Sequence, residues 1–474
     1  MKIEAAEKSY DTSVCFCFED SAEYQALDEN IKRCFDGTFL TAYYGAAGSG
    51  KDVVIIGCGR VLKERIRIKE AAAKALKLCR EKKRFALNVN AAAIIDRFGR
   101  DSIGDIAEGF FLAAYQPISF AARKHEEEAF VVALSGIRES DRQQVNDLLK
   151  RQKAICEGIL FAREMGNLPG NHLRPADFAN HIIELVKDLN VEAVIFKRDE
   201  LIKMGMTALL SVGDSSAELP CFLVLRYRGD PENERVLGLI GKGVTVDTGG
   251  YCLKPADAMS GIKGDMAGGA AAAGALYAIA KTNERTNLVV CIPMCENRIS
   301  AGSLLPGDVI SSYSGKTIEI IDTDAEGRLI LADAVAYALE AEGVTEILDV
   351  ATLTGAVVRT LGFTVAGAMC DDDRFYDRFE KACQISGERY WRLPFYDEHK
   401  KMMESEIADI KNSSSDGCKT ITAGVFIRAF AKGKPWLHLD IAGTAWTQEP
   451  VFEFQTKGAT GAGVSTIYYL AGGK

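Results

Sequence analysis

The stretch of sequence that decides the fold is VLGLIGKGVTVDTGGYCLK, residues 236–254. It contains two apolar runs, 236–240 and 244–247, which we predict to be buried strands. The second run ends in Asp247, and two glycines follow shortly after it. A carboxylate at the end of a strand, beside paired glycines, lies where a sheet commonly opens onto a ligand crevice. We therefore expect a functional site at this point of the chain.

Further strand-like and helical segments alternate on both sides of this stretch. Alternation of this kind is typical of α/β proteins, in which helices cover a sheet. In the second part of the chain, the predicted strands are 221–227, 288–293, 317–322 and 347–353, and the predicted helices are 266–281 and 329–342.

The first part of the chain shows the same alternation. Its predicted elements are strands at 52–58, 84–89 and 129–134 and an amphipathic helix at 65–82. Residues 139–165 are polar, with apolar residues at helical spacing, which predicts a long connecting helix. We therefore predict an α/β protein of two domains, 1–150 and 151–474, with the boundary on that helix.

The composition is that of an ordinary globular chain and excludes several classes of protein. Of 474 residues, 47% are hydrophobic, and 57 basic residues stand against 66 acidic ones, a net charge of −9. This balance disfavours non-specific nucleic-acid binding, which needs surplus Lys and Arg. No apolar run reaches the length of about 20 residues that a bilayer span requires. The N-terminal residues also lack the apolar core of a secretory signal.

The 13 cysteines are scattered and include no CxxC pair. Zinc-site spacing is therefore absent, and reduced, buried thiols in a cytoplasmic protein are the favoured interpretation. The chain also contains neither HExxH nor GxSxG. Hydrolytic chemistry would therefore have to come from other residue types.

A second unusual segment, IIDTDAEGRL, covers residues 320–329. If this segment stays extended, alternation places Asp322, Asp324, Glu326 and Arg328 on one face. So many carboxylates on one face repel each other unless cations compensate them. Hard divalent cations prefer carboxylate oxygens as ligands, so the segment points to a metal site.

Two divalent ions would balance the charge of the acidic candidates in both segments. Those candidates are Asp247, Asp265, Asp324 and Glu326. Near two cations a lysine ammonium is disfavoured, so Lys242 and Lys254 can lose a proton and join as neutral nitrogen ligands.

Three other acids nearby have a structural interpretation. Asp257 and Asp322 are expected to cap turns or to accept hydrogen bonds from the backbone. Asp333 is expected to face solvent on the helix that follows Arg328.

The two segments, GKGVTVDTGGYCLKPAD and DTDAEGRL, resemble the signatures of the leucyl aminopeptidase family of dinuclear metallopeptidases. Further matching strings are NLPGNHLRPADF, SGKTIE, DVATLTGA, HLDIAGTAW and KGATGAG. The resemblance is dense over residues 150–474 and weak over 1–150. It implies a metal-dependent aminopeptidase, a hydrolase that removes N-terminal residues, apolar ones such as leucine, from peptides.

The resemblance also implies a role for each matching residue. One metal ion would be held by Lys242, Asp247, Asp265 and Glu326, and a more exchangeable one by Asp247, Asp324 and Glu326. Lys254 would polarise the substrate carbonyl and the developing oxyanion, and Arg328 would hold a bicarbonate that serves as general base. The pocket for the N-terminal side chain would be lined by Ile262, Thr352 and Gly355.

The family resemblance further implies zinc or manganese as the ions, a homohexamer, and a catalytic domain built on a central mixed sheet flanked by helices. One departure is visible, because the family commonly has Asn where this chain has Asp322. Since Asp322 is not an expected ligand, the extra negative charge bears on metal affinity or pH dependence and not on ligation.

Three alternatives remain open at this point. The first is a dipeptidase of the same chemistry. The second is an architectural or regulatory DNA-binding role, which the acidic balance disfavours. The third is a catalytically inactive scaffold, which the presence of every matched ligand disfavours.

Overall fold

The computed structural model describes residues 1–8, 10–46, 50–60, 64–121, 129–414 and 417–472. These residues separate into two compact units. The first unit comprises Met1–Glu157 and Glu449–Lys457, and the second comprises Gly158–Gln448 and Gly458–Lys474. The connecting helix predicted at 139–165 is observed as a short 3-10 turn, η2 (Glu139–Asp141), followed by helix α6 (Arg142–Asn167). The units therefore divide at residue 157, whereas the sequence placed the boundary near residue 150.

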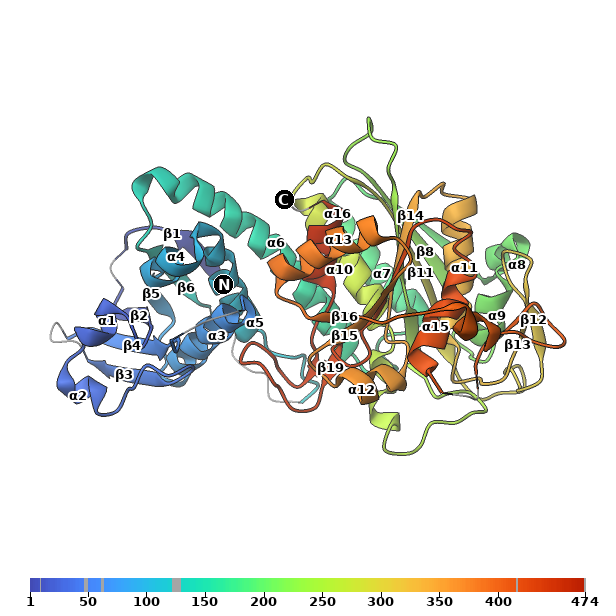
Figure 1. Cartoon of the computed structure of the whole chain (residues 1–474), viewed down its shortest axis with the longest axis horizontal. Helices are drawn as coiled ribbons and strands as arrows, with labels where there is room; N and C mark the ends of the chain where they lie inside the picture. The colour runs from blue at the N-terminus through green and yellow to red at the C-terminus, as the bar shows by residue number, and fades with distance from the viewer. Residues whose placement is uncertain (9, 47–49, 61–63, 122–128, 415–416, 473–474) are drawn as a thin grey trace. The chain divides into compact units, whose positions relative to one another are not determined.

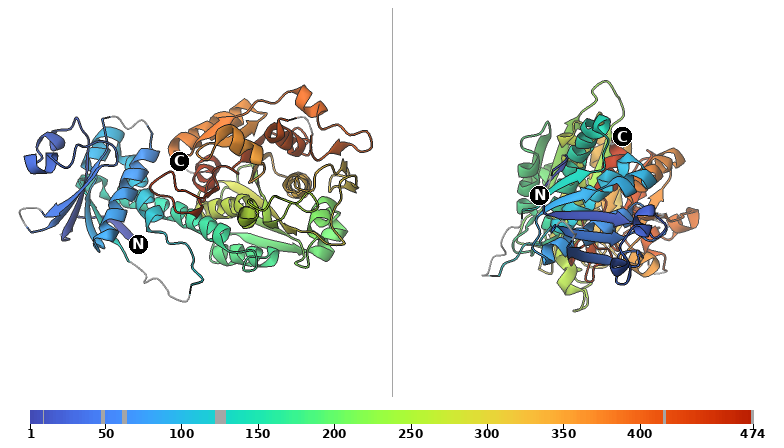
Figure 2. Two further views of the ribbon diagram at one scale, coloured as in Figure 1. Left: turned by 90° about the horizontal axis from the view of Figure 1, so that it is seen from below. Right: turned by 90° about the vertical axis from the view of Figure 1, so that its left-hand side faces the viewer.

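The described part of the first unit contains a six-stranded sheet in the order β1-β6-β5-β2-β4-β3 (Figure 1 and Figure 2). Neighbouring strands are parallel except for the edge strand β3, which is antiparallel to β4. The strands are β1 (Lys2–Ala5), β2 (Thr12–Cys17), β3 (Ala42–Ala46), β4 (Asp52–Gly57), β5 (Ala86–Asn90) and β6 (Val131–Ser135). The helices are α1 (Ala22–Gln25), α2 (Glu29–Lys32), α3 (Ile66–Glu81), α4 (Ala92–Phe98), η1 (Arg100–Ser102) and α5 (Ile103–Ala114). The strands and the helix predicted for this region are thereby confirmed within two residues at each end.

The segment Glu449–Lys457 joins the first unit from far along the chain. Glu453 lies 3.4 Å from Lys74 Nζ and 3.0 Å from Lys77 Nζ, and both lysines are on α3. The two lysines that pair with Glu453 precede it by almost 380 residues in the sequence. No local pattern predicts such a pairing.

The described part of the second unit contains a nine-stranded mixed sheet in the order β16-β15-β18-β14-β9-β11-β8-β7, with β10 also paired to β11. The four central strands β18, β14, β9 and β11 are mutually parallel, and β8, β7 and β15 run antiparallel to their inner neighbours. These strands are β7 (Glu192–Lys197), β8 (Cys221–Arg228), β9 (Leu237–Gly241), β10 (Gly243–Asp247), β11 (Asn287–Asn297), β14 (Glu346–Ala351), β15 (Ala366–Cys370), β16 (Tyr390–Arg392) and β18 (Trp436–Asp440). The expected mixed sheet is therefore confirmed.

Helices cover both faces of this sheet. Figure 1 shows α10, α13 and α16 on one side of the strands and α11 and α15 on the other. The helices of this unit are α7 (Pro175–Val186), α8 (Arg198–Met204), α9 (Thr207–Gly213), η3 (Met259–Gly264), α10 (Ala267–Lys281), α11 (Gly327–Glu340), α12 (Gly355–Leu361), α13 (Asp373–Ser386), α14 (Asp397–Lys401), α15 (Lys419–Arg428) and α16 (Val464–Ala471). The remaining short strands are β12 (Val309–Ser311), β13 (Thr317–Glu319), β17 (Ile410–Lys411), β19 (Trp446–Thr447) and β20 (Gly458–Ala459).

The small residues of α10 allow it to lie very close to the sheet. A Cβ atom on Gly268 would lie 2.1 Å from the carbonyl oxygen of Val350 in β14. Any side chain at this position would push the helix away from the strands. The close approach brings Asp265, which precedes α10, to the ends of β9 and β14.

Asp333 corrects one of the sequence predictions. It was expected to face solvent, but its side chain has no exposed surface. Helix α11 packs against the sheet on one side and against α9 and α15 on the others, so it has no solvent face at this position. The Asp333 carboxylate accepts hydrogen bonds from the backbone N–H groups of Leu209 (3.0 Å) and Tyr313 (2.7 Å).

None of the helices within the described ranges combines the length and the apolar character that crossing a membrane requires.

Candidate active site

Lys242 lies at a break between two collinear strands. β9 and β10 pair in turn with the long strand β11, and Lys242 is the residue between them. Its backbone N–H donates to Val350 O (3.1 Å), and its carbonyl accepts from Gly269 N–H (2.7 Å). At this break the buried side chain of Lys242 turns toward two carboxylates. Its Nζ lies 2.7 Å from Asp265 and 2.8 Å from Glu326.

Asp247 ends strand β10, as the sequence predicted, and its carboxylate is fixed on both oxygens. Oδ1 accepts hydrogen bonds from Asn297 Nδ2 and from Gly249 N–H, each at 2.9 Å. Oδ2 lies 2.7 Å from Lys254 Nζ. Gly249 has a φ of 87°, and a Cβ there would lie 2.9 Å from Asp324 Oδ1. Glycine is therefore required where this loop approaches the second acidic segment.

The second acidic segment is a turn and not an extended strand. The strand predicted at 317–322 is shorter in the structure, because β13 ends at Glu319. The segment therefore does not stay extended, and the condition for placing residues 322–328 on one face is not met. The cause is Asn412, whose Oδ1 accepts from Ile321 N–H (2.8 Å) and whose Nδ2 donates to Asp322 O (2.7 Å). These hydrogen bonds to the Asn412 side chain take the place of hydrogen bonds to a neighbouring strand. Helix α11 begins directly after Glu326.

Asp322 caps this turn, in agreement with its predicted structural role. Its Oδ1 accepts a hydrogen bond from Asp324 N–H at 3.0 Å. The turn places Asp324 beside Lys254, whose Nζ contacts Asp324 Oδ1. It also places Glu326 beside Lys242, so the two lysines each join acids from different segments.

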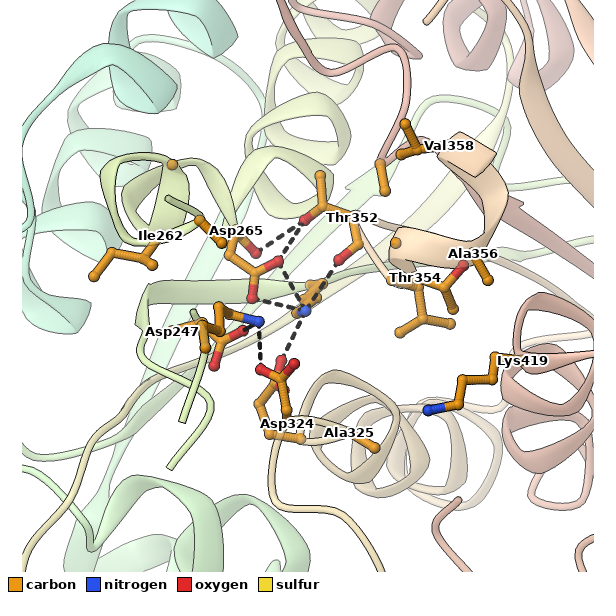
Figure 3. Close-up of a pocket in the computed structure, with 18 of the residues that line it drawn as sticks. Asp247, Ile262, Asp265, Asp324, Ala325, Thr352, Thr354, Ala356, Val358 and Lys419 are labelled. Carbon is orange, nitrogen blue, oxygen red and sulfur yellow. Dashed lines mark hydrogen bonds and ion pairs between the residues drawn. The ribbon is translucent and has the colours of Figure 1, made fainter. Parts of the chain in front are cut away.

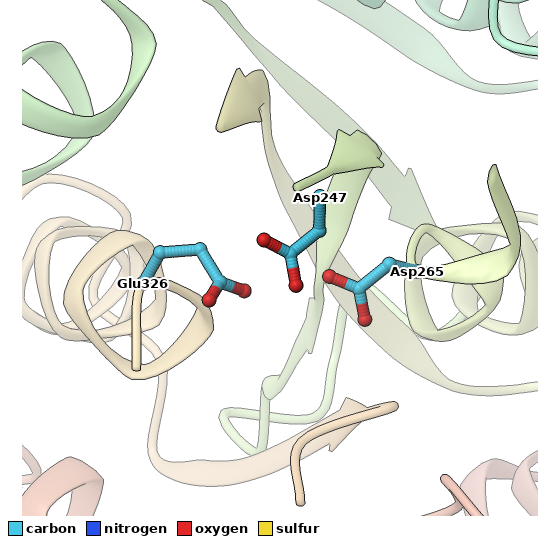
Figure 4. A group of neighbouring side chains, drawn as sticks. All are labelled: Asp247, Asp265 and Glu326. Atoms are coloured by element: carbon cyan, nitrogen blue, oxygen red, sulfur yellow. The ribbon is translucent and has the colours of Figure 1, made fainter. Parts of the chain in front are cut away.

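Four carboxylates thus gather around two lysines, and we call the set of Asp247, Asp265, Asp324 and Glu326 the acidic cluster. Asp247, Asp265 and Glu326 each offer an oxygen within 4.8 Å of the others, and Figure 4 shows these carboxylates converging. Thr352 Oγ1 donates to Asp265 Oδ1 at 2.9 Å. Glu326 is buried, yet its Oε2 accepts no hydrogen bond from any described residue.

Burial and mutual repulsion make the acidic cluster costly without cations. Burial raises the pKa of Asp265 well above its ordinary value, and Lys242 only partly offsets this. The pKa of Asp324 rises to about 7, because burial and the charges of Asp247 and Glu326 act together. Burial opposes the charge of Lys242 and Lys254, but the carboxylates outweigh it and raise the pKa of both lysines.

The residues fit a pair of divalent ions. The acidic cluster carries four potential negative charges, and its donor atoms are carboxylate oxygens, which hard divalent cations prefer. The buried Glu326 Oε2 without a hydrogen-bond partner is an available ligand atom. A bound cation would oppose the charge of a lysine that coordinates it, so Lys242 could join as a neutral nitrogen ligand.

Arg328 lies on the first turn of α11, on the side of the site next to Asn412. Arg328 is 5% exposed, and its guanidinium donates from Nη1 to Asn412 O at 2.8 Å. Its Nε has no hydrogen-bond partner among the described residues. Burial lowers the pKa of Arg328 to about 10, so the side chain remains charged near neutral pH. A buried charge with an unused donor fits a small anion.

The acidic cluster, Lys242, Lys254 and Arg328 line one cavity of about 670 Å³ in the second unit (Figure 3). The predicted pocket residues Ile262, Thr352 and Gly355 line it, and so does Asp322. Sequence reasoning missed other lining residues, namely Arg359, Phe363, Ser413, Lys419 and Trp446. It also missed the positioning residues Asn297 and Asn412. Trp446 ends the matched string HLDIAGTAW, so a signal for it was present, whereas no spacing rule distinguishes Asn297, Asn412 or Lys419.

Comparison with known proteins places this site in a family. The model of the cytosol aminopeptidase family, catalytic domain, matches residues 160–468. The chain is 38% identical over 427 residues to a probable cytosol aminopeptidase of Clostridium perfringens, covering 89% of this chain and 86% of that protein. A probable cytosol aminopeptidase of Bacillus subtilis is 41% identical over 372 residues, 78% of this chain and 74% of that protein.

Solved structures extend the likeness over the whole chain. The bottromycin maturation enzyme BotP superposes with a TM-score of 0.88 at 29% identity, covering 98% of this chain and 99% of that one. Its complex with Mn gives a TM-score of 0.89 at the same identity and coverage. From the family match, the relatives and the clustered acids together, the chain belongs to the cytosol aminopeptidase family.

Proposed function

We propose that this protein is a metal-dependent aminopeptidase that hydrolyses the N-terminal peptide bond of peptides, with a preference for apolar residues such as leucine. The observation that carries the proposal is the acidic cluster with the buried Lys242 and the half-buried Lys254 inside a cavity of about 670 Å³. Membership of the cytosol aminopeptidase family supports it.

The residues that would hold two divalent ions are those of the acidic cluster together with Lys242. One ion would be held by Lys242, Asp247, Asp265 and Glu326, and the other by Asp247, Asp324 and Glu326. Two such ions supply an activated water and stabilise negative charge on the attacked carbonyl. The similarity to BotP, which has been solved in complex with Mn, supports manganese as one of the ions, with zinc as the other candidate.

Lys254 is the residue that we propose to act on the reacting carbonyl. Its Nζ reaches the cavity between Asp247 and Asp324, held by a 2.7 Å contact to Asp247 Oδ2. A positive charge fixed at this point stabilises an oxyanion more strongly than a neutral carbonyl, and therefore favours the transition state.

Arg328 would hold a bicarbonate ion as the general base. Support comes from its buried guanidinium, whose Nε has no hydrogen-bond partner among the described residues and which lines the same cavity. Ile262, Thr352 and Gly355 would contact the substrate's N-terminal side chain, because they line the cavity beside Asp265 and Lys242. Ile262 contributes the apolar surface that favours leucine.

The direct test is hydrolysis of leucinamide by the purified full chain. We expect release of leucine, loss of activity with a chelator, and recovery with Mn²⁺, Zn²⁺ or Co²⁺. N-acetyl-leucinamide is the matched control, because it lacks the free amine that an aminopeptidase requires. No hydrolysis with any of these ions, or equal hydrolysis of the blocked amide, would overturn the proposal.

We further propose that residues 151–474 carry the catalysis and that the protein acts in the cytoplasm as a homohexamer without nucleic acid. The relatives are named cytosol aminopeptidases, which supports the location. The net charge of −9 supports the absence of nucleic acid. Light scattering of the metal-loaded protein tests the assembly, since six chains of 51.5 kDa have a distinct mass.

A further inference from the structure

Lys419 is an exposed lysine on the wall of the active-site cavity. It is the first residue of α15 and follows Cys418, which has a φ of 49°. Figure 3 draws its side chain reaching from α15 with the amino group directed into the cavity. Lys419 lines that cavity, and no ion pair joins it to any residue in the described ranges. Its charge is therefore available to a bound molecule.

The wall around Lys419 carries more positive than negative charge. Arg359 of α12 also lines the cavity and has no ion-pair partner in the part of the chain that the structure describes. Helices α12 and α15 pack together, which brings these two cationic elements to one side of the cavity. Asp322, the acid that lines the cavity outside the acidic cluster, already accepts a backbone hydrogen bond from Asp324.

Bound metal ions would increase this excess of positive charge. Two divalent ions would neutralise the four carboxylates of the acidic cluster, and the proposed bicarbonate would neutralise Arg328. The remaining charge of the loaded cavity would be that of Lys254, Arg359 and Lys419 against Asp322. Of these groups, Lys254 faces the reacting centre. Arg359 and Lys419 remain for a different part of the substrate.

The position of Lys419 indicates which part that is. In Figure 3, Ile262 and Lys419 lie on opposite sides of the carboxylates of Asp247 and Asp265. A peptide with its N-terminal side chain toward Ile262 and its scissile bond at the acidic cluster extends beyond the cluster toward Lys419. In the same view the lining residues near Lys419 include the apolar Ala325 and the neutral Thr354, so Lys419 supplies a positive charge on this side.

We propose that Lys419 is a specificity-determining residue that binds a carboxylate on the C-terminal side of the scissile bond, assisted by Arg359. This inference rests on the proposed aminopeptidase function and adds a substrate class to it, namely acidic or very short peptides. The carboxylate has two sources. One is the terminal α-carboxylate of a dipeptide, and the other is an Asp or Glu side chain after the scissile bond.

Two matched substrate pairs distinguish the sources. Leu-Gly is compared with Leu-Gly-NH2, and Leu-Asp-NH2 is compared with Leu-Asn-NH2, each as the ratio of kcat/KM for acid over amide. We expect the wild-type ratio to exceed one in at least one pair and to fall as salt is added, because Lys419 is exposed and screened.

Variants assign the ratio to Lys419. Lys419→Ala is expected to lower it about tenfold, the equivalent of one charge-assisted hydrogen bond of about 1.4 kcal/mol. Lys419→Glu is expected to lower it further, and Lys419→Arg to restore it. Lys434→Ala is the matched control, because Lys434 is exposed and lies outside the cavity lining. Ratios that are the same in the wild type, Lys419→Ala and Lys419→Glu would overturn the proposal.

A binding measurement separates failure of this inference from failure of the proposed function. The probe is leucyl-glycine with the peptide bond reduced to CH2–NH, as free acid and as amide, titrated into Mn²⁺-loaded protein by calorimetry. Absence of turnover with acid-selective binding that Lys419→Ala removes would refute the aminopeptidase and retain the carboxylate site. Turnover with equal binding of acid and amide would refute the carboxylate site alone.

Discussion

The acidic cluster, in which Asp247 and Glu326 are buried, and the buried carboxylate of Asp333 both lie in the second unit, but they are compensated in opposite ways. Asp333 has both oxygens engaged, by the N–H groups of Leu209 and Tyr313. In the acidic cluster, Glu326 Oε2 accepts no hydrogen bond from a described residue, and four carboxylates face two lysines. A buried acid whose oxygens are satisfied by the backbone is part of the fold, whereas crowded and unsatisfied acids prepare a site for cations.

The first unit offers a third arrangement, in which acids and bases are matched. Asp105 lies 2.8 Å from Arg65, and Glu108 lies 2.7 Å from Lys69, with Asp105 and Glu108 only 3% and 5% exposed. Burial still raises the pKa of Asp105 to about 6. Matched pairs of this kind join α3 to α5 without a surplus of charge that would call for metal ions.

The largest effect is expected from Glu326→Gln, which tests whether the acidic cluster holds metal ions. It replaces one proposed ligand and removes one charge from the acidic cluster. We expect kcat/KM for leucinamide to fall by at least about a thousandfold, because metal-centred charge stabilisation is worth several kcal/mol. Elemental analysis should show less than the wild-type metal content. Glu340→Gln, at the exposed end of the same helix, is the control, and full metal content in Glu326→Gln would refute the ligand assignment.

Lys254→Ala tests whether the charge of Lys254 acts on the substrate or helps to hold the metal ions. We expect kcat to fall by about 10²–10³, the range for loss of one oxyanion-stabilising group. Metal content should stay at the wild-type level, because Lys254 is not among the proposed ligands. The measurements are steady-state kinetics and elemental analysis of the same preparation. Loss of metal together with activity would instead make Lys254 part of the metal site.

Asp333→Asn and Glu326→Gln should change stability in opposite directions in the presence of a chelator. Asp333→Asn places an NH2 group against backbone N–H donors and is expected to lower the free energy of unfolding by about 1–3 kcal/mol. Glu326→Gln relieves repulsion among the carboxylates and is expected to raise the melting temperature of the metal-free protein. Thermal and urea unfolding measure both. A loss of stability in both variants would remove the proposed difference between the two centres.

The smallest effect is expected from the buried pair of His438 and Asp349, which lie 2.5 Å apart between Nδ1 and Oδ1. Burial opposes the charge of His438, but Asp349 outweighs burial and raises the pKa of the imidazole above its ordinary value. The folded state therefore binds the proton more tightly than the unfolded state does. The resulting stability is fully present below the unfolded pKa of about 6.5 and is lost as the pH rises through the folded pKa.

His438→Gln should abolish this pH dependence. We expect the difference in free energy of unfolding between the wild type and His438→Gln to be larger at pH 6 than at pH 9, as measured by urea titration. A difference that stays constant over this range would mean that the pair does not titrate.

Much of the fold followed from local patterns. The runs at 236–240 and 244–247 became β9 and β10, and the long helix at 139–165 became α6, because apolar periodicity is set by nearby residues. The proposed ligands also came from local order, since acid, glycine and lysine recur at fixed spacing within two short segments. Asp247, Asp265 and Glu326 then lie together, although almost 80 residues separate the first from the last.

Only the tertiary structure decided which other residues support or extend that site. Asn412 holds the turn at Asp322 and contacts Arg328 from across the fold, and Lys419 reaches the cavity from the start of α15. Asp333 was assigned to solvent because nothing in its own segment reveals α9 and Tyr313 on its far side. The sequence by itself determined strands, helices and ligand types, since these depend on neighbours along the chain. Burial, hydrogen-bond satisfaction and the charge of the cavity wall depend on segments far apart in sequence, and folding alone brings those segments together.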